Sequence, residues 1–228
     1  MSSSDFAGWR RATTLVCLLA VIAATTHAHA QALVPESTGV EMGFRVGYGL
    51  PIGDSARVGG RVEGVVPFTL DLGYRITTYW YVGVLASFGI LSLDQASLGC
   101  GVAAYPDSCE GTTMRLALDV QYRNTNGGQW ARWVGFGLGL EAMGIAMSLS
   151  SSVASGFELG HVEVGAGWFA RPRFAIGPFA TLAVGRFSTS ELVSGPCEAC
   201  PPPYPPDIGK GLHAWLTLGL RMMLNFGR

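Results

Sequence analysis

Residues 212–226 read LHAWLTLGLRMMLNF, and this stretch decides the fold. Apolar side chains occupy every second position: Leu212, Ala214, Leu216, Leu218, Leu220, Met222, Leu224 and Phe226. The positions between them hold mostly polar, small or charged residues: His213, Trp215, Thr217, Gly219, Arg221, Met223 and Asn225. Successive side chains of a β-strand point to opposite faces, so a period of two predicts a strand whose faces meet different surroundings.

The same alternation recurs upstream. It is found at residues 40–50, 62–75, 79–92, 114–123, 131–147, 157–170 and 173–187, although glycine replaces many of the polar residues in the later segments. With the last segment, eight strands are predicted. Most soluble strands are about five or six residues long. These segments are long enough to cross a bilayer, which takes about nine to eleven tilted residues.

Composition and alternation together predict a transmembrane barrel. Apolar residues make up 49% of the chain and charged residues only 14%, compared with about 25% in soluble domains. In an outer-membrane barrel the apolar face meets lipid and the polar or small residues face the interior. We therefore predict an all-β fold, an eight-stranded antiparallel up-and-down transmembrane β-barrel.

The predicted connections alternate in length. Three are short, at 76–78, 124–129 and 171–173, and four are longer, at 51–61, 93–111, 148–156 and 188–211. Short periplasmic turns and longer external loops are typical of such barrels. Aromatic residues cluster near the short turns, where we expect an interfacial girdle: Tyr74, Tyr79, Trp80, Tyr81, Tyr122, Trp130, Trp133, Trp168, Phe169, Phe174 and Phe226.

A helical alternative rests on two apolar stretches. Residues 76–93 carry no charge, and 133–149 carry only Glu141, so both could be transmembrane helices. However, 76–93 is rich in Thr, Tyr, Val and Gly, and its β-branched and aromatic residues favour strands. The alternating segments elsewhere would also have no place in a helical protein. We therefore favour the barrel.

The first thirty residues predict export. Arg10 and Arg11 precede an apolar stretch at 12–26, and Ala28-His29-Ala30 is a small-x-small cleavage site. We expect a signal peptide at 1–30 and a barrel domain at 31–228, in the bacterial outer membrane. No separate peptidoglycan-binding domain is expected after Phe226.

Export places the cysteines of the predicted barrel domain in an oxidising compartment, where disulfides persist. The preferred pairs are Cys100–Cys109 and Cys197–Cys200, because each closes a local loop, although other pairings remain open. Cys197 and Cys200 also form a CxxC motif. The surrounding prolines do not provide the helix start that lowers a redox thiol's pKa, so we favour a structural disulfide.

Inward-facing charges are the main candidate site. Taking the polar face as inward, the lumen residues are Glu41, Arg45, Asp71, Arg75, Arg115, Asp119, Glu141, His161, Glu163 and Arg221. Side chains just fill an eight-stranded barrel. Unpaired charges there would be costly, so an ion-pair plug is expected. The alternative is a narrow polar pathway, for which the inward glycines would leave room.

Catalysis, metal binding and nucleic-acid binding are not expected. His161 and Glu163 share a strand face and Glu141 lies on the preceding strand, but the nearby serines, Ser148 and 150–152, show no catalytic signature. These groups are too few for a closed metal site. A formal net charge of −1 gives no sign of a basic surface for nucleic acid. We expect a protein that is not an enzyme and has no cofactor.

With these features in place, residues 39–226 resemble the small eight-stranded outer-membrane barrels of the OmpX, OmpW and OmpA-transmembrane-domain kind. The final strand, ending in Phe226, is similar to that family's assembly signal, although Gly227 and Arg228 follow it. The resemblance implies outer-membrane lipid and the barrel-assembly machinery as partners.

The leading functional hypothesis is a structural or surface-interaction barrel, whose loops 93–111 and 188–211 meet an external ligand. One alternative is a narrow, porin-like channel for small solutes or hydrophobic compounds. Another is a lipid-modifying barrel enzyme that depends on His161.

Overall fold

The computed structural model describes residues 38–53, 56, 61–98, 100, 109–124, 129–147, 150–194, 208 and 210–227. The predicted signal peptide at 1–30 lies outside these residues. The strands are β1 (Gly39–Ile52), β2 (Val62–Arg75), β3 (Trp80–Leu93), β4 (Glu110–Asn124), β5 (Trp130–Met147), β6 (Ser150–Arg171), β7 (Phe174–Ser194) and β8 (Leu212–Asn225). One short helix, α3 (Gln95–Leu98), follows β3.

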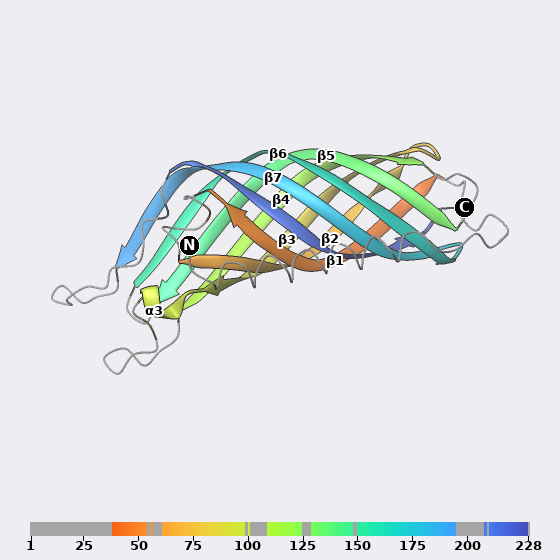
Figure 1. Cartoon of the computed structure of the whole chain (residues 1–228). Coiled ribbons are helices and arrows are strands. Elements are labelled where there is room, and N and C mark those ends of the chain that lie inside the picture. The colour runs from red at the N-terminus through yellow and green to blue at the C-terminus, as the bar shows by residue number, and fades with distance from the viewer. Residues whose placement is uncertain are drawn as a thin grey trace, which may run out of the picture. The chain divides into compact units, whose positions relative to one another are not determined.

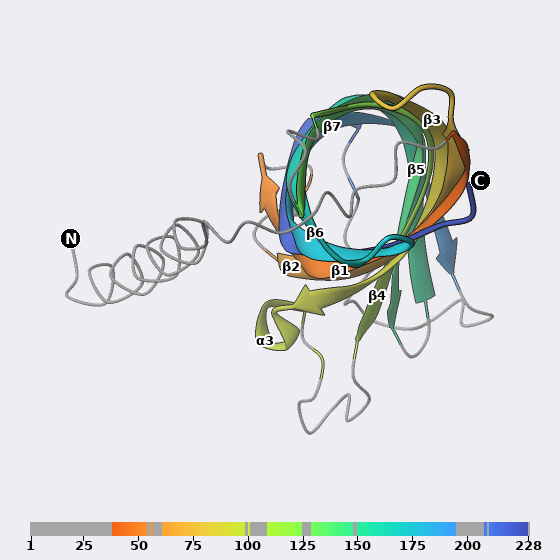
Figure 2. The ribbon, with the colours of Figure 1, turned by 90° about the vertical axis from the view of Figure 1, so that its right-hand side faces the viewer.

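The strands form one closed antiparallel barrel in the order β1 to β8 (Figures 1 and 2). Each strand pairs with its neighbour in sequence, and β8 returns to β1, where Val46 pairs with Leu220. The predicted fold class is therefore confirmed. The helical alternative is wrong, because β3 and β5 occupy the two apolar stretches. Among the described residues, no helix is long and apolar enough to cross a membrane.

The two faces of the sheet differ in polarity as predicted. Leu118 and Leu220 point outward and are 59% and 52% exposed. Asp71 and Arg221 point inward and are at most 1% exposed. This arrangement is the reverse of a soluble protein. An outer wall of this kind is stable against lipid hydrocarbon and not against water.

The two ends of the barrel are named here by their connections. The turn end carries the connections at 76–79 and 172–173 and the last strand residue, Asn225. The loop end carries α3 and the connections that leave β1, β3, β5 and β7. In Figure 1, α3 and the end of β7 lie at the same end of the barrel.

Strands β6 and β7 extend further than the sequence suggested. They contain 22 and 21 residues, compared with 14 in β1. The predicted loop at 148–156 is wrong, because β5 ends at Met147 and β6 begins at Ser150. The predicted loop at 188–211 is also too long, since 188–194 belong to β7. A serine-rich sequence favours turns only weakly. Here backbone pairing to neighbouring strands, such as Ser151 with Ala146, overrides that preference.

Register shifts interrupt the pairing of the described strands at five places, and two of them reverse the orientation of a glutamate. The register shifts between Val62 and Gly64, so Val62 is buried and Glu63 is exposed, the opposite of the expected orientation. A second shift lies between Glu158 and Gly160. A β-bulge inserts one residue into one strand, which moves the following side chains to the other face.

Near the loop end the polarity of the wall inverts. The interior there is an apolar cluster of Ala56, Val62, Val65, Leu91, Met143, Ile145, Ala154, Phe187, Ile208 and Trp215. On β2, β4, β6 and β7 the outward positions at this end include the exposed polar residues Glu63, Glu110, Thr112, Ser155 and Ser188. An apolar interior under a polar surface is stable in water. This part of the barrel is therefore suited to project beyond the hydrocarbon layer.

The predicted aromatic girdle holds only in part. Tyr74, Tyr79, Trp80, Tyr122, Trp130, Trp168 and Phe226 are exposed, and Phe174 is half-buried. Tyr81, Trp133 and Phe169 are instead buried, at 5% exposure or less. Their inward orientation follows the alternation of their strands. Tyr81 and Trp133 pack against arginine guanidinium groups, and Phe169 packs with Ala131, Ala175 and Met223.

A close contact between β6 and β7 gives a first prediction. A Cβ atom on Gly177 would lie 1.7 Å from the backbone oxygen of Ala166, whereas one on Gly160 would meet only the Gly137 oxygen, at 3.6 Å. Gly177→Ala should therefore lower the free energy of unfolding by about 1–3 kcal/mol. Gly160→Ala is the matched control and should change it little. Urea unfolding in detergent micelles measures both, and equal midpoints would contradict the close approach.

Candidate functional site

The candidate site is the charged interior of the barrel. All of the predicted lumen residues except Arg115 are less than 9% exposed. The Arg115 side chain, which also points inward, is 19% exposed. Their partners divide the interior into four groups, which we describe from the turn end to the loop end.

Glu41 is the centre of the group nearest the turn end. Its carboxylate accepts two hydrogen bonds from Arg123, at 2.5 and 2.6 Å, and one from Arg75, at 2.8 Å. The Arg123 guanidinium also lies 5.1 Å from the centre of the Tyr81 ring. A two-pronged arginine–carboxylate contact is strong and fixes the geometry of both groups. Arg123 is only 2% exposed, so it belongs to the network and not to the rim.

The next group joins four strands. Arg45 donates to Asp71, at 2.8 Å, and to Glu163. Arg221 donates to the other oxygen of Asp71. The Trp133 ring lies 5.7 Å from the Arg45 guanidinium and 4.8 Å from that of Arg221, within cation–π range. Two buried cations are thereby matched by two carboxylates.

Gln121 links these two groups, although it was not among the predicted site residues. Its side-chain oxygen accepts hydrogen bonds from Arg123 and Arg221, at 2.8 and 2.9 Å. Its amide nitrogen donates to Glu163 at 2.9 Å and to Asp119 at 2.5 Å. The sequence places Gln121 on the polar face of its strand, but only the assembled barrel shows that it bridges several charges.

Glu158 is the centre of the third group. It accepts two hydrogen bonds from Arg115, both at 2.7 Å, and also contacts Nδ1 of His161. The other ring nitrogen of His161 lies 3.5 Å from Asp119. The buried ring therefore lies between two carboxylates. The described contacts of His161 include no hydroxyl group that it could activate as a nucleophile.

Glu158 was missed because the β-bulge reverses the alternation within β6. A single alternation through the strand cannot place both Glu158 and His161 inward, since they are three residues apart. A local signal did exist. Phe157 and Leu159 flank Glu158 and are each 58% exposed, so the residue between them must face inward.

The fourth group differs from the sequence-based expectation. Glu141 does not join His161 and Glu163. Its carboxylate instead lies 2.7 Å from Nε2 of His213, whose ring stacks on Phe187 at 4.1 Å. The strands are staggered, so Glu141 pairs with Gly156 and lies nearer the loop end than His161.

Apolar side chains lie in the interior on the loop-end side of the charges. Met143, Phe187 and Trp215 are at most 7% exposed. They border a cavity of about 30 Å³, which Ser87 and Thr217 also line. A cavity of that size holds about one water molecule. Among the described residues, no group of three or more His, Cys, Asp or Glu side chains could hold a metal ion.

The segment at the loop end is held by a disulfide. Cys100 and Cys109 are bonded, as predicted, and both are buried with Leu98. The Gln95 side chain makes two hydrogen bonds to the backbone of Cys109, each 2.9 Å long. The predicted Cys197–Cys200 pair lies outside the described residues.

Asp94 immediately precedes helix α3 and lies outside the strands. It accepts hydrogen bonds from the hydroxyl of Ser97 and from the backbone N–H groups of Ser97 and Ala96. These hydrogen bonds hold the pKa of Asp94 below its usual value, and the bond from the Ser97 hydroxyl contributes most. Such side chains stabilise the first turn of a helix.

Comparison with solved structures identifies the architecture. Neisserial surface protein A matches with a TM-score of 0.54 and 10% identity, over 84% of this chain and all, 100%, of that one. The chain has the fold of the small outer-membrane β-barrels. Ail of Yersinia pestis matches more weakly, with a TM-score of 0.41 and 12% identity, over 84% of this chain and 100% of that one. The N-terminal barrel domain of Pseudomonas aeruginosa OprF matches with a TM-score of 0.40 and 16% identity, over 84% of this chain and 98% of that one. No protein-family model and no curated protein matches this chain.

The Glu41 group gives a second prediction. Glu41→Gln would remove the carboxylate that the buried Arg75 and Arg123 share. Removal of one partner from a buried ion pair costs about 3–5 kcal/mol. We expect a loss of that size in denaturant unfolding, followed by tryptophan fluorescence. The control is Glu63→Gln, because Glu63 is exposed and, within the described residues, its carboxylate accepts one long hydrogen bond, 3.4 Å, from Ser92. Equal effects of the two substitutions would show that the Glu41 contacts add nothing to stability.

Proposed function

We propose that this protein is a non-conducting outer-membrane barrel with a structural or surface-interaction role. The observation that carries the proposal is the packing of the interior. Ion pairs lie along the lumen from Glu41 to Glu141, and apolar side chains around Trp215 lie on the loop-end side of them. A solute would have to displace both layers. The barrel therefore serves as a support for what it presents at the loop end.

Three observations support the outer-membrane location. The outward wall is apolar along the strands, the fold is that of outer-membrane barrels, and the sequence predicts a signal peptide at 1–30. The Cys100–Cys109 disulfide is consistent with an exported protein, because disulfides persist in oxidising compartments.

The proposed interaction surface is at the loop end. It includes the disulfide-held segment after β3 and the extended ends of β6 and β7. Ser155, Ser188 and Thr189 expose hydroxyl groups there. We propose that an external ligand meets loops 93–111 and 188–211 at this surface.

The turn end offers the proposed assembly signal. Phe226 is 58% exposed, and its backbone N–H donates to the oxygen of Val40 at 2.8 Å. The aromatic ring is thus held at the seam between the first and last strands. We propose that the barrel-assembly machinery recognises this strand.

A second candidate is a protein that takes up small hydrophobic compounds. The specific observation in its favour is the apolar interior near the loop end, which contains Met143, Phe187 and Trp215. The charged groups beyond it count against passage along the barrel axis. A lipid-modifying role for His161 has less support, because its described partners are Glu158 and Asp119.

The closed interior predicts electrical silence. The purified protein, reconstituted in a planar bilayer, should show no steady single-channel conductance. Glu163→Ala should also be silent, because the apolar layer around Trp215 remains in place. Flotation of the same preparation with lipid vesicles would verify that both proteins insert. Reproducible conductance that changes with Glu163→Ala would refute the proposed closed barrel.

The proposed orientation predicts which end is accessible on cells. An epitope tag inserted between Cys100 and Cys109 should bind antibody on intact cells. The same tag between Pro172 and Arg173, at the turn end, should bind only after the outer membrane is permeabilised. The opposite pattern would reverse the topology and remove the proposed interaction surface.

A further inference from the structure

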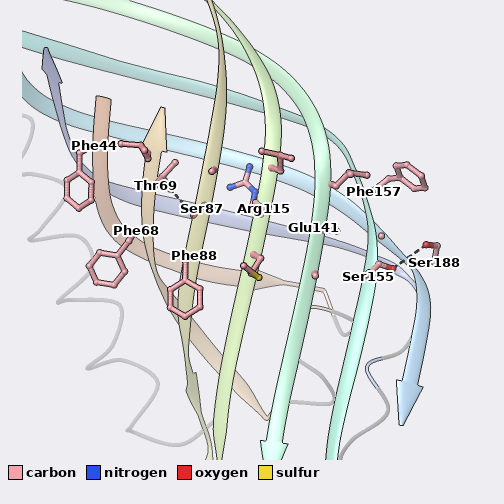
Figure 3. Close-up of a pocket in the computed structure, with 17 residues that line it drawn as sticks. Phe44, Phe68, Thr69, Ser87, Phe88, Arg115, Glu141, Ser155, Phe157 and Ser188 are labelled. Atoms are coloured by element: carbon pink, nitrogen blue, oxygen red, sulfur yellow. Dashed lines mark hydrogen bonds between the residues drawn. The ribbon is translucent and has the colours of Figure 1, made fainter. Parts of the chain in front are cut away.

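The outer wall of the barrel contains a groove of about 690 Å³ (Figure 3). Its lining includes the outward-facing residues Phe44, Phe68, Ala86, Phe88, Ala142 and Phe157. Figure 3 shows the rings of Phe44, Phe68 and Phe88 projecting from successive strands, with Phe157 on the opposite side of the groove. These six side chains lie on the outer face of the sheet, and the lining also includes Thr69, Ser87, Arg115 and Glu141 of the same strands, whose side chains lie on the inner face.

Two alanines explain why the wall is hollow at this place. Ala86 pairs with Leu70 and Leu116, and Ala142 pairs with Met114. At both positions a methyl group lies among side chains that are several atoms longer. The small side chains leave a depression that lipid-facing rings border. A flexible hydrocarbon chain fits such a surface better than a rigid one.

The groove slopes toward the loop end. Directly paired residues form one row around the barrel: Phe44, Leu70, Ala86, Leu116, Leu140, Phe157, Arg186 and Leu212. Leu212 lies beyond Ala214, the partner of Ile52, so the row returns to β1 nearer the loop end than Phe44. The groove therefore runs from deep in the wall to the rim near the loop end. An acyl chain in the bilayer follows the same direction, with its headgroup at the rim.

A polar group completes the rim of the groove. Arg186 pairs with Phe157 across β6 and β7, and its side chain is exposed on the outer wall. The described residues provide it with no ion-pair partner. Ser155 and Ser188 line the groove beside it, and the Ser155 hydroxyl lies 2.7 Å from that of Thr189. The Ser188 hydroxyl donates to the backbone oxygen of Ser155, so the group suited to a phosphate oxygen is the guanidinium of Arg186.

The surroundings of Arg186 also favour an anion. Val184, Phe157 and Leu212 lie nearby on the outer wall and are 39%, 58% and 64% exposed. An arginine at the edge of an apolar surface is costly in hydrocarbon unless its charge reaches the headgroup region or is paired. A lipid phosphate at that level would provide the missing partner.

We propose that this groove is a binding site for an anionic, phosphate-bearing acyl lipid of the leaflet at the loop end. The acyl chain lies over Ala86 and Ala142, and the phosphate accepts hydrogen bonds from Arg186. Charge complementarity selects a phospholipid over a neutral lipid, and the apolar groove selects an acylated molecule over a free phosphate. This site does not depend on whether the lumen is closed.

Titration of the delipidated full chain with phosphatidylglycerol, followed by native mass spectrometry from non-ionic detergent, tests the proposal. Arg186→Gln should weaken binding about tenfold, the loss expected for one hydrogen bond to a charged group. Arg173→Gln is the matched control, because Arg173 is exposed at the turn end, and it should bind as the unmodified protein does. Equal binding by the two variants would overturn the proposed phosphate contact.

Filling the groove tests the acyl part separately. Ala142→Leu should weaken binding of phosphatidylglycerol, and Ala86→Leu provides a second variant if the first does not fold. Diacylglycerol, which lacks the phosphate, should bind weakly to all forms. Glycerol phosphate, which lacks acyl chains, should not compete. Unchanged binding to a folded groove variant, or full competition by glycerol phosphate, would overturn the proposal.

Discussion

Backbone hydrogen bonding between β1 and β8 is the contact on which the rest of this structure depends. An open sheet would expose unpaired N–H and C=O groups to hydrocarbon, at a cost of several kcal/mol each. The pairing of Val46 with Leu220 belongs to the ladder that removes both edges. Closure also divides the side chains into two populations. One faces lipid, and the other is confined in an interior that side chains just fill.

Confinement explains the character of the interior. Glu41, Asp71 and Glu158 each contact at least two cationic or potentially cationic side chains. Sharing of one carboxylate by two partners packs the interior while leaving little charge unmatched. The resulting network joins strands that are distant in the sequence. Such an interior is suited to hold the wall rigid.

The outer surface has separate regions with separate physical roles. The wall around Leu118 meets hydrocarbon, and the groove at Ala86 and Ala142 interrupts that wall. Nearer the loop end the apolar side chains move inside, as at Phe187, while Ser188 faces outward. Arg186 lies where these regions meet. One continuous set of strands therefore provides a membrane anchor, a proposed lipid site and a water-exposed extension.

The sequence by itself determined the fold class and the inward position of charges such as Arg45 and Asp71, and it favoured the Cys100–Cys109 pair. Each follows from local information, namely a period of two or a short separation in the chain. The tertiary structure alone decided which charges meet. Glu141 contacts His213 and not His161, and Glu158 enters the network, because strand stagger and a β-bulge set those contacts. Stagger depends on closure of the whole barrel, and no single strand encodes it.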